Sequence, residues 1–205
     1  MNIFQLISCF IRMISNTLIF IETGLPLFEP ACGMGNISNV LRENPFYKFN
    51  VVVQDLYTSF VTEHKDYLTT LDPLYSFLIT NPPFCLKFEF LEKAFLSGRP
   101  FAMILPILCY FTVRGSALFE KYPLAIFAFR RNVVFEHNGR KTAYSGMAWF
   151  VGNLGEKKDF ATIQYIDALD LNEGDDESFS TIGQDDINVI SFAITGADIE
   201  EVSML

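Results

Sequence analysis

The 205-residue sequence has few of the residues that build metal sites and disulfide frameworks. It contains four cysteines and two histidines. No Cys-x-x-Cys pair and no zinc-ligand spacing occurs among them, so we expect no metal site. Without a disulfide framework the cysteines are expected to be reduced, which favours an intracellular protein, cytoplasmic or nuclear depending on the host.

The sequence also lacks a recognisable secretion signal. Met1–Ile21 is rich in Ile, Phe and Leu, but Arg12 interrupts this run, and neither a basic start nor a small-residue cleavage site is present. We therefore predict a packed helix within the apolar segment 1–24 and no membrane partner. A membrane anchor, a signal sequence and a wrongly assigned start are the alternatives.

Negative charge is concentrated in the last quarter of the chain. The net charge is −9, and from Glu156 onward 13 acidic residues against two lysines contribute −11, so residues 1–155 carry +2. This division predicts a folded domain over residues 25–155 and an acidic, partly disordered tail over residues 156–205. A mildly cationic body leaves nucleic acid open as a partner.

Apolar runs of strand length alternate with helical stretches, a pattern typical of an α/β fold. The predicted strands are Leu25–Phe28, Asn50–Val53, a third region near Tyr67, Phe77–Thr80, Phe101–Leu105, Ala125–Phe129 and Ala148–Val151. The predicted helices are Asn36–Arg42, Phe88–Leu96 and Gly115–Lys121. We expect a Rossmann-like, seven-stranded, mostly parallel sheet with helices on both faces, and we assign no element beyond Gly155.

A glycine turn follows the first predicted strand, in Glu29-Pro30-Ala31-Cys32-Gly33-Met34-Gly35. Such a turn lets the main chain pass close to a nucleoside cofactor. The turn lacks the Gly-x-Gly-x-x-Gly spacing and the Gly-Lys-Ser/Thr of a P-loop, which disfavours dinucleotides, ATP and GTP. Glu29, at the strand end, suits the ammonium group of a methionine moiety.

Two further acidic residues follow in order along the chain. Asp55, after the second predicted strand, can accept hydrogen bonds from both hydroxyls of a ribose. Asp66, just before Tyr67, can accept one from an adenine amino group. Each alone is typical of a solvated loop, but the series of acids at strand ends favours S-adenosylmethionine as the cofactor.

The tetrapeptide Asn81-Pro82-Pro83-Phe84 ends the apolar run Tyr75–Thr80. The exocyclic amine of adenine is a poor nucleophile, because its lone pair is delocalised into the ring. The side-chain oxygen of Asn81 and the carbonyl of Pro82 can accept both amino hydrogens and localise that lone pair toward a methyl sulfonium. The prolines keep these acceptors aimed, and Phe84 offers a face for stacking an extruded base. The alternative is a rigid turn that caps the following helix.

These two motifs resemble the cofactor and catalytic motifs of adenine-N6 DNA methyltransferases. Leu105-Pro106, Arg131–Phe135 and Ala148–Val151 are similar to phage-type members, so the resemblance spans residues 25–152 and implies the class I methyltransferase fold. By this resemblance, S-adenosylmethionine is held by Glu29, Pro30, Ala31, Gly33, Gly35, Asp55, Asp66 and Asn81. The target base is held by Asn81, Pro82, Pro83 and Phe84.

Four basic residues flank a predicted hairpin around His137–Gly139: Arg130, Arg131, Arg140 and Lys141. They could contact phosphates beside the catalytic loop, although dispersed surface charge explains them equally well. We predict methyl transfer to the N6 amine of adenine in DNA. The alternatives are N-methylation of an RNA base or a protein glutamine, and a catalytically inactive binding subunit with a methyltransferase fold.

Overall fold

The computed structural model of the chain describes residues 24–43, 49–62, 64–137, 140–154, 162–166 and 189–190. The apolar segment up to residue 23, most of the acidic segment 156–205 and the hairpin tip Asn138-Gly139 lie outside these residues. Within the described residues, no helix is both long and apolar enough to cross a bilayer.

The described part contains one large sheet, one hairpin and several helices. The strands are β1 (Leu27–Glu29), β2 (Val51–Val53), β3 (Phe77–Thr80), β4 (Phe101–Pro106), β5 (Leu124–Phe129), β6 (Val133–His137), β7 (Arg140–Tyr144), β8 (Met147–Gly152), β9 (Thr162–Ile166) and β10 (Val189–Ile190). The α-helices are α2 (Asn36–Arg42), α3 (Lys87–Leu96) and α4 (Val113–Lys121), and the 3-10 helices are η2 (Phe84–Leu86) and η3 (Ile107–Phe111).

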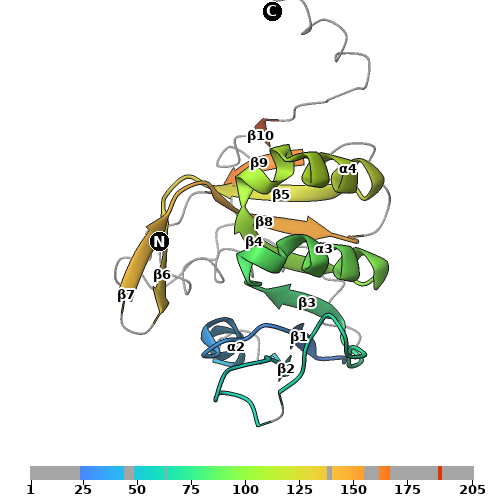
Figure 1. The fold of residues 1–205 in the computed structure, drawn as a ribbon, viewed down its shortest axis with the longest axis vertical. Coiled ribbons are helices and arrows are strands. Elements are labelled where there is room, and N and C mark those ends of the chain that lie inside the picture. The colour runs from blue at the N-terminus through green and yellow to red at the C-terminus, as the bar shows by residue number, and fades with distance from the viewer. Residues whose placement is uncertain are drawn as a thin grey trace, which may run out of the picture.

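The main sheet is mixed but mostly parallel, as predicted. Its order is β10-β9-β5-β8-β4-β3-β1-β2, and β6 pairs only with β7 (Figure 1). Strands β2, β1, β3 and β4 are parallel, whereas β8 runs antiparallel to both of its neighbours, β4 and β5. Strand β9 extends the sheet parallel to β5, and β10 pairs with it antiparallel.

Six of the predicted strands and all three predicted helices are present, but the prediction of seven strands is wrong. The region near Tyr67 forms a turn. The backbone carbonyl of Asp66 accepts hydrogen bonds from the N–H groups of Thr69 and Thr70, and its side chain accepts one from Leu68. These local hydrogen bonds replace those that a strand would form with a neighbour. Two strands that were not predicted, β9 and β10, lie beyond Gly155.

The helices cover both faces of the sheet, and strand side chains alternate between the two resulting cores. On one face, Phe101, Met103 and Leu105 of β4 pack in a core with residues of α3 and α4. On the other face, Ala102 and Ile104 of the same strand belong to a second core, which includes residues of α2. Every side chain of β4 up to Leu105 is therefore buried, which explains its continuous apolar sequence.

The predicted hairpin is confirmed and consists of β6 and β7. It connects the end of β5 to the start of β8, and β8 runs opposite to β4 and β5. The hairpin must therefore emerge at the edge of the sheet where the parallel strands end. Figure 1 shows it projecting from the left side of the sheet, the side to which β3, β4 and β5 point.

Candidate functional site

The order of the strands defines where this sheet can bind a ligand. The chain passes from β1 to its neighbour β2 on one side and then crosses to β3 on the other side. In open α/β sheets, ligands bind at such a reversal, beyond the carboxyl ends of the strands. The register aligns Phe28 with Leu78, so Glu29 comes opposite Ile79, two residues before Asn81. The two sequence motifs therefore meet at the same edge of adjacent strands.

The glycine turn has the backbone conformation that its sequence predicts. Gly33 and Gly35 have φ angles of 52° and 77°, in the left-handed region that favours glycine. A Cβ atom on Gly33 would meet no atom within 4 Å, so the main chain here faces open space. A Cβ on Gly35 would lie 2.2 Å from Cζ of Phe60. The ring of Phe60, from the loop after β2, therefore packs directly on the turn.

Glu29 is a buried carboxyl group at the end of β1, with an exposed fraction of 1%. Its Oε2 atom accepts a hydrogen bond from the backbone N–H of Ser38 at 2.9 Å. Burial raises the pKa of Glu29 to about 8, more than the hydrogen bonds from Ser38 and the charge of Arg42 lower it. Without a cationic ligand this group is therefore mostly protonated at neutral pH, and a cation nearby would favour its ionised form.

Asp55 ties the glycine turn to the loop after β2. Its Oδ2 accepts a hydrogen bond from the N–H of Gly33 at 2.9 Å, and its Oδ1 accepts from the N–H groups of Tyr57 and Thr58 at 2.9 and 3.1 Å. A carboxylate offers about four lone-pair positions. The three backbone donors hold this side chain in place and leave acceptor capacity on Oδ2 for a ligand hydroxyl.

Asn81 and its neighbours form the loop that follows β3. The Oδ1 atom of Asn81 is buried and has no hydrogen-bond partner among the described residues. Pro82 is buried, Pro83 is exposed, and η2 begins at Phe84. An orphaned buried acceptor is unfavourable unless a ligand donates to it.

The ring of Phe84 is held by the β6–β7 hairpin. Its centroid lies 6.3 Å from that of Phe135 and 6.1 Å from that of Tyr144, in edge-on geometry. Lys87 holds the backbone of the same loop, because its Nζ donates to the Phe84 carbonyl at 3.1 Å. The contacts of Tyr144 and Lys87 were not predicted. The apolar run Val133–Phe135 of β6 was the only sequence signal for the packing of the hairpin on this loop.

The four predicted basic residues lie on or beside this hairpin. Arg130 and Arg131 are exposed between β5 and β6, and Arg140 and Lys141 are exposed on β7. All four residues therefore lie at the carboxyl edge of the sheet, where the hairpin emerges and packs against Phe84. Among the described residues, no group of three or more His, Cys, Asp or Glu side chains could hold a metal ion.

Comparison with known proteins places the fold. No family model matches the sequence, and no curated protein matches it. The structure is similar to the methyltransferase subunit of a type I restriction-modification system from Streptococcus thermophilus, with a TM-score of 0.57, 12% identity, and coverage of 80% of this chain and 46% of that one. It is also similar to a class I S-adenosylmethionine-dependent methyltransferase from Listeria monocytogenes, with a TM-score of 0.53, 13% identity, and coverage of 78% and 63%.

A third similar structure is the M protein of the type I restriction enzyme EcoKI, with a TM-score of 0.52, 14% identity, and coverage of 80% of this chain and 47% of that one. The chain thus spans about half the length of the two type I proteins. These likenesses show that the chain has the α/β fold of class I S-adenosylmethionine-dependent methyltransferases. They do not extend to a substrate.

Proposed function

We propose that this protein is an S-adenosylmethionine-dependent methyltransferase that acts on the exocyclic N6 amine of adenine in DNA. The observation that carries the proposal is the buried Oδ1 atom of Asn81, which has no hydrogen-bond partner in the part of the chain that the structure describes and which follows β3 beside the glycine turn of β1. A neutral amino group of a substrate would supply the donor for this acceptor. The position of Asn81 at the strand reversal supports a substrate amine that binds beside the cofactor.

The residues at the end of β1 and β2 fit S-adenosylmethionine. Glu29 is a buried carboxyl group whose ionised form needs a cation, and the ammonium of the cofactor is one. Gly33 leaves open space where a side chain would stand, and Asp55 is held by three backbone donors with acceptor capacity left for a ribose. When bound, the cofactor supplies an electrophilic methyl group on a positively charged sulfur.

The loop after β3 would hold the target base. Asn81 Oδ1 and the Pro82 carbonyl would accept the two amino hydrogens and localise the nitrogen lone pair, and the prolines limit the reorganisation that this requires. Phe84 would stack on a base turned out of the helix, with its ring plane set by Phe135 and Tyr144. No base is needed before transfer, because the proton can leave afterwards.

The hairpin supports a nucleic acid as the substrate. Arg130, Arg131, Arg140 and Lys141 would contact backbone phosphates on either side of the extruded base. A double-stranded substrate has phosphates on both sides of the target base. Arg130 and Arg131 at the base of the hairpin, and Arg140 and Lys141 on its second strand, would contact phosphates at these two positions. A glutamine amide carries no phosphate groups for these cations to contact.

Labelled S-adenosylmethionine and unmethylated DNA test the proposal. The DNA is digested after reaction, and mass spectrometry is expected to find N6-methyladenine. Asn81→Ala should abolish the product, whereas Asn39→Ala, an exposed asparagine on α2, should not. Label on RNA or on a glutamine amide would overturn the substrate. A protein that neither transfers methyl groups nor binds S-adenosylhomocysteine would be an inactive subunit with this fold.

A further inference from the structure

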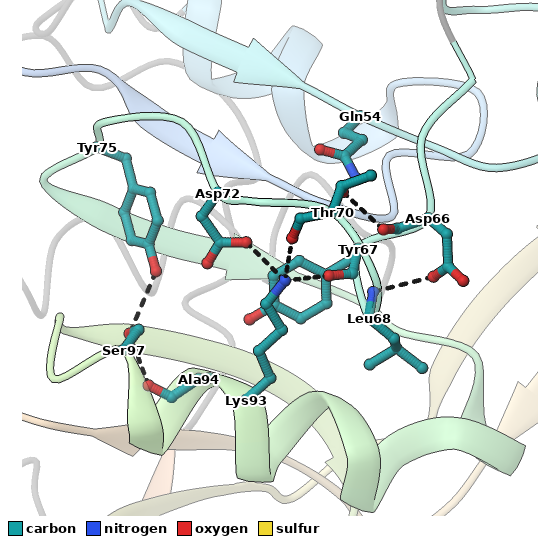
Figure 2. A network of polar contacts seen from close by, with 10 residues as sticks. All are labelled: Gln54, Asp66, Tyr67, Leu68, Thr70, Asp72, Tyr75, Lys93, Ala94 and Ser97. Atoms are coloured by element: carbon teal, nitrogen blue, oxygen red, sulfur yellow. Dashed lines mark hydrogen bonds and ion pairs between the residues drawn. The ribbon is translucent and has the colours of Figure 1, made fainter.

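The ammonium group of Lys93 connects α3 to the turn that stands in place of the expected strand (Figure 2). Its Nζ donates to the carbonyl of Tyr67, to the carbonyl of Thr70 at 2.7 Å and to Oδ1 of Asp72 at 2.9 Å. It also lies 4.3 Å from the centroid of the Tyr67 ring. An ammonium group has three N–H donors, so this one is fully used.

Lys93 supplies the turn with donors that a neighbouring strand would otherwise provide. In a strand, the carbonyls of Tyr67 and Thr70 would accept from backbone N–H groups of the next strand. Here the ammonium group of Lys93 donates to both carbonyls. A second contact comes from the residue after β2, because Nε2 of the buried Gln54 donates to Oγ1 of Thr70 at 3.2 Å. The turn is therefore fixed from α3 on one side and from the sheet on the other.

This turn presents Asp66. The carbonyl of Asp66 accepts from Thr70 Oγ1 at 2.6 Å, and its side-chain Oδ1 accepts from the N–H of Leu68 at 2.9 Å. Its Oδ2 atom has no hydrogen bond in the described part of the chain. Together with the bonds that its carbonyl accepts from the N–H groups of Thr69 and Thr70, these hydrogen bonds close the same turn that Lys93 holds, so the position of Oδ2 depends on that turn.

We propose that Lys93 is a positioning residue that fixes the Asp66 carboxylate for recognition of the 6-amino group of the cofactor's adenine. This inference rests on the proposed function, which supplies the cofactor. The side chains of Lys93 and Asp72 are only 24% and 17% exposed. Loss of the cation would leave a largely buried carboxylate and two carbonyls without a donor, and the turn would rearrange to reach water.

The test compares two ligands that differ at the relevant atom, 5′-methylthioadenosine and 5′-methylthioinosine. The first carries an amino group that donates to Asp66, and the second carries an oxo group that the carboxylate repels. Calorimetry should show that the wild-type protein prefers the adenosine by about tenfold or more. In Lys93→Met the preference should fall to about twofold or less, because Asp66 is no longer held. A purely structural role would change stability but not this ratio.

Arg114→Met is the matched control. Arg114 lies on α4 and pairs with Glu89 and Glu92 of α3, so its loss removes ion pairs from the same helix as Lys93 without touching the turn. Its ligand preference should equal that of the wild type. A wild-type preference in Lys93→Met, or an equal loss in Arg114→Met, would overturn the inference.

Lys93→Arg keeps the cation beside Asp72 and is the second variant if Lys93→Met does not fold. A planar guanidinium cannot direct N–H groups at all three acceptors, so the preference should be reduced. A full preference in Lys93→Arg would then overturn the inference. Wild-type protein that binds neither ligand and does not bind S-adenosylhomocysteine would overturn the proposed function itself, which distinguishes the two failures.

Discussion

The buried carboxyl group of Glu29 should make the stability of the fold depend on pH. Its pKa is 4.5 in the absence of burial and about 8 in the fold. A raised pKa favours the protonated form in the fold, so the contribution of Glu29 is most favourable below pH 4.5 and is lost as the pH rises to about 8. Each pH unit in this window costs about 1.4 kcal/mol, which amounts to about 3 kcal/mol at neutral pH.

Glu29→Gln removes this titration while preserving the shape of the side chain. The amide oxygen can still accept the hydrogen bond from the N–H of Ser38. We therefore expect the variant to be more stable than the wild type by about 3 kcal/mol at neutral pH and equally stable below pH 4.5, where both side chains are neutral. The gain in stability should accompany a loss of affinity for S-adenosylhomocysteine, whose ammonium would no longer meet a carboxylate.

Urea unfolding of both proteins without ligand, at several pH values from about 4 to 8, measures the difference. Glu120→Gln is the control, because Glu120 is an exposed carboxylate on α4. It should not reproduce the gain in stability of Glu29→Gln at neutral pH. A Glu29→Gln variant that is less stable than the wild type at neutral pH, or whose advantage is the same at all pH values, would refute the reasoning.

Three other variants test separate parts of the site. Asn81→Ala should lower single-turnover methyl transfer to DNA by about 100-fold or more, with a much smaller change in the Kd for S-adenosylhomocysteine; equal losses in both would contradict its role at the base. Replacing Arg140 and Lys141 by Gln should reduce the slope of log K for DNA against log salt by about 2 in binding titrations, whereas Lys121→Gln, at the opposite edge of the sheet, should leave it unchanged. Gly35→Ala should cost about 1–3 kcal/mol in urea unfolding from the positive φ, plus a clash with Phe60. The cost should be smaller in a Phe60→Ala background, and the same cost in both backgrounds would show that the ring does not clash.

The elements that the sequence predicts well are those whose burial is complete or whose ends are marked. Strands β3 and β4 are continuous apolar runs, and β4 ends at a proline. The glycine turn could be predicted because Gly33 and Gly35 adopt φ angles that other residues rarely tolerate. At these positions local chemistry alone sets the structure.

The remaining features depend on contacts between distant residues. The sequence around Tyr67 was predicted to form a strand, but this segment is a turn. Lys93, which holds the turn, is 23 residues beyond Thr70, so no local pattern includes it. Strand β9 pairs along its whole length with β5, more than 30 residues earlier. The contact between Phe84 and Tyr144 likewise joins segments that no local window includes.

Two polar groups at neighbouring strand ends are held in states that lower the stability of the fold. Glu29 is a carboxyl group removed from water, and Asn81 Oδ1 is a buried acceptor without a donor in the described part of the chain. An unpaired buried acceptor costs about 1–3 kcal/mol, and apolar side chains of similar shape would remove that cost. Violations of local stability rules are expected where a ligand, rather than the protein, completes the interactions. A cation beside Glu29 together with an amino donor beside Asn81 would satisfy both groups at once, and a methyl sulfonium amino acid next to an exocyclic amine is such a pair.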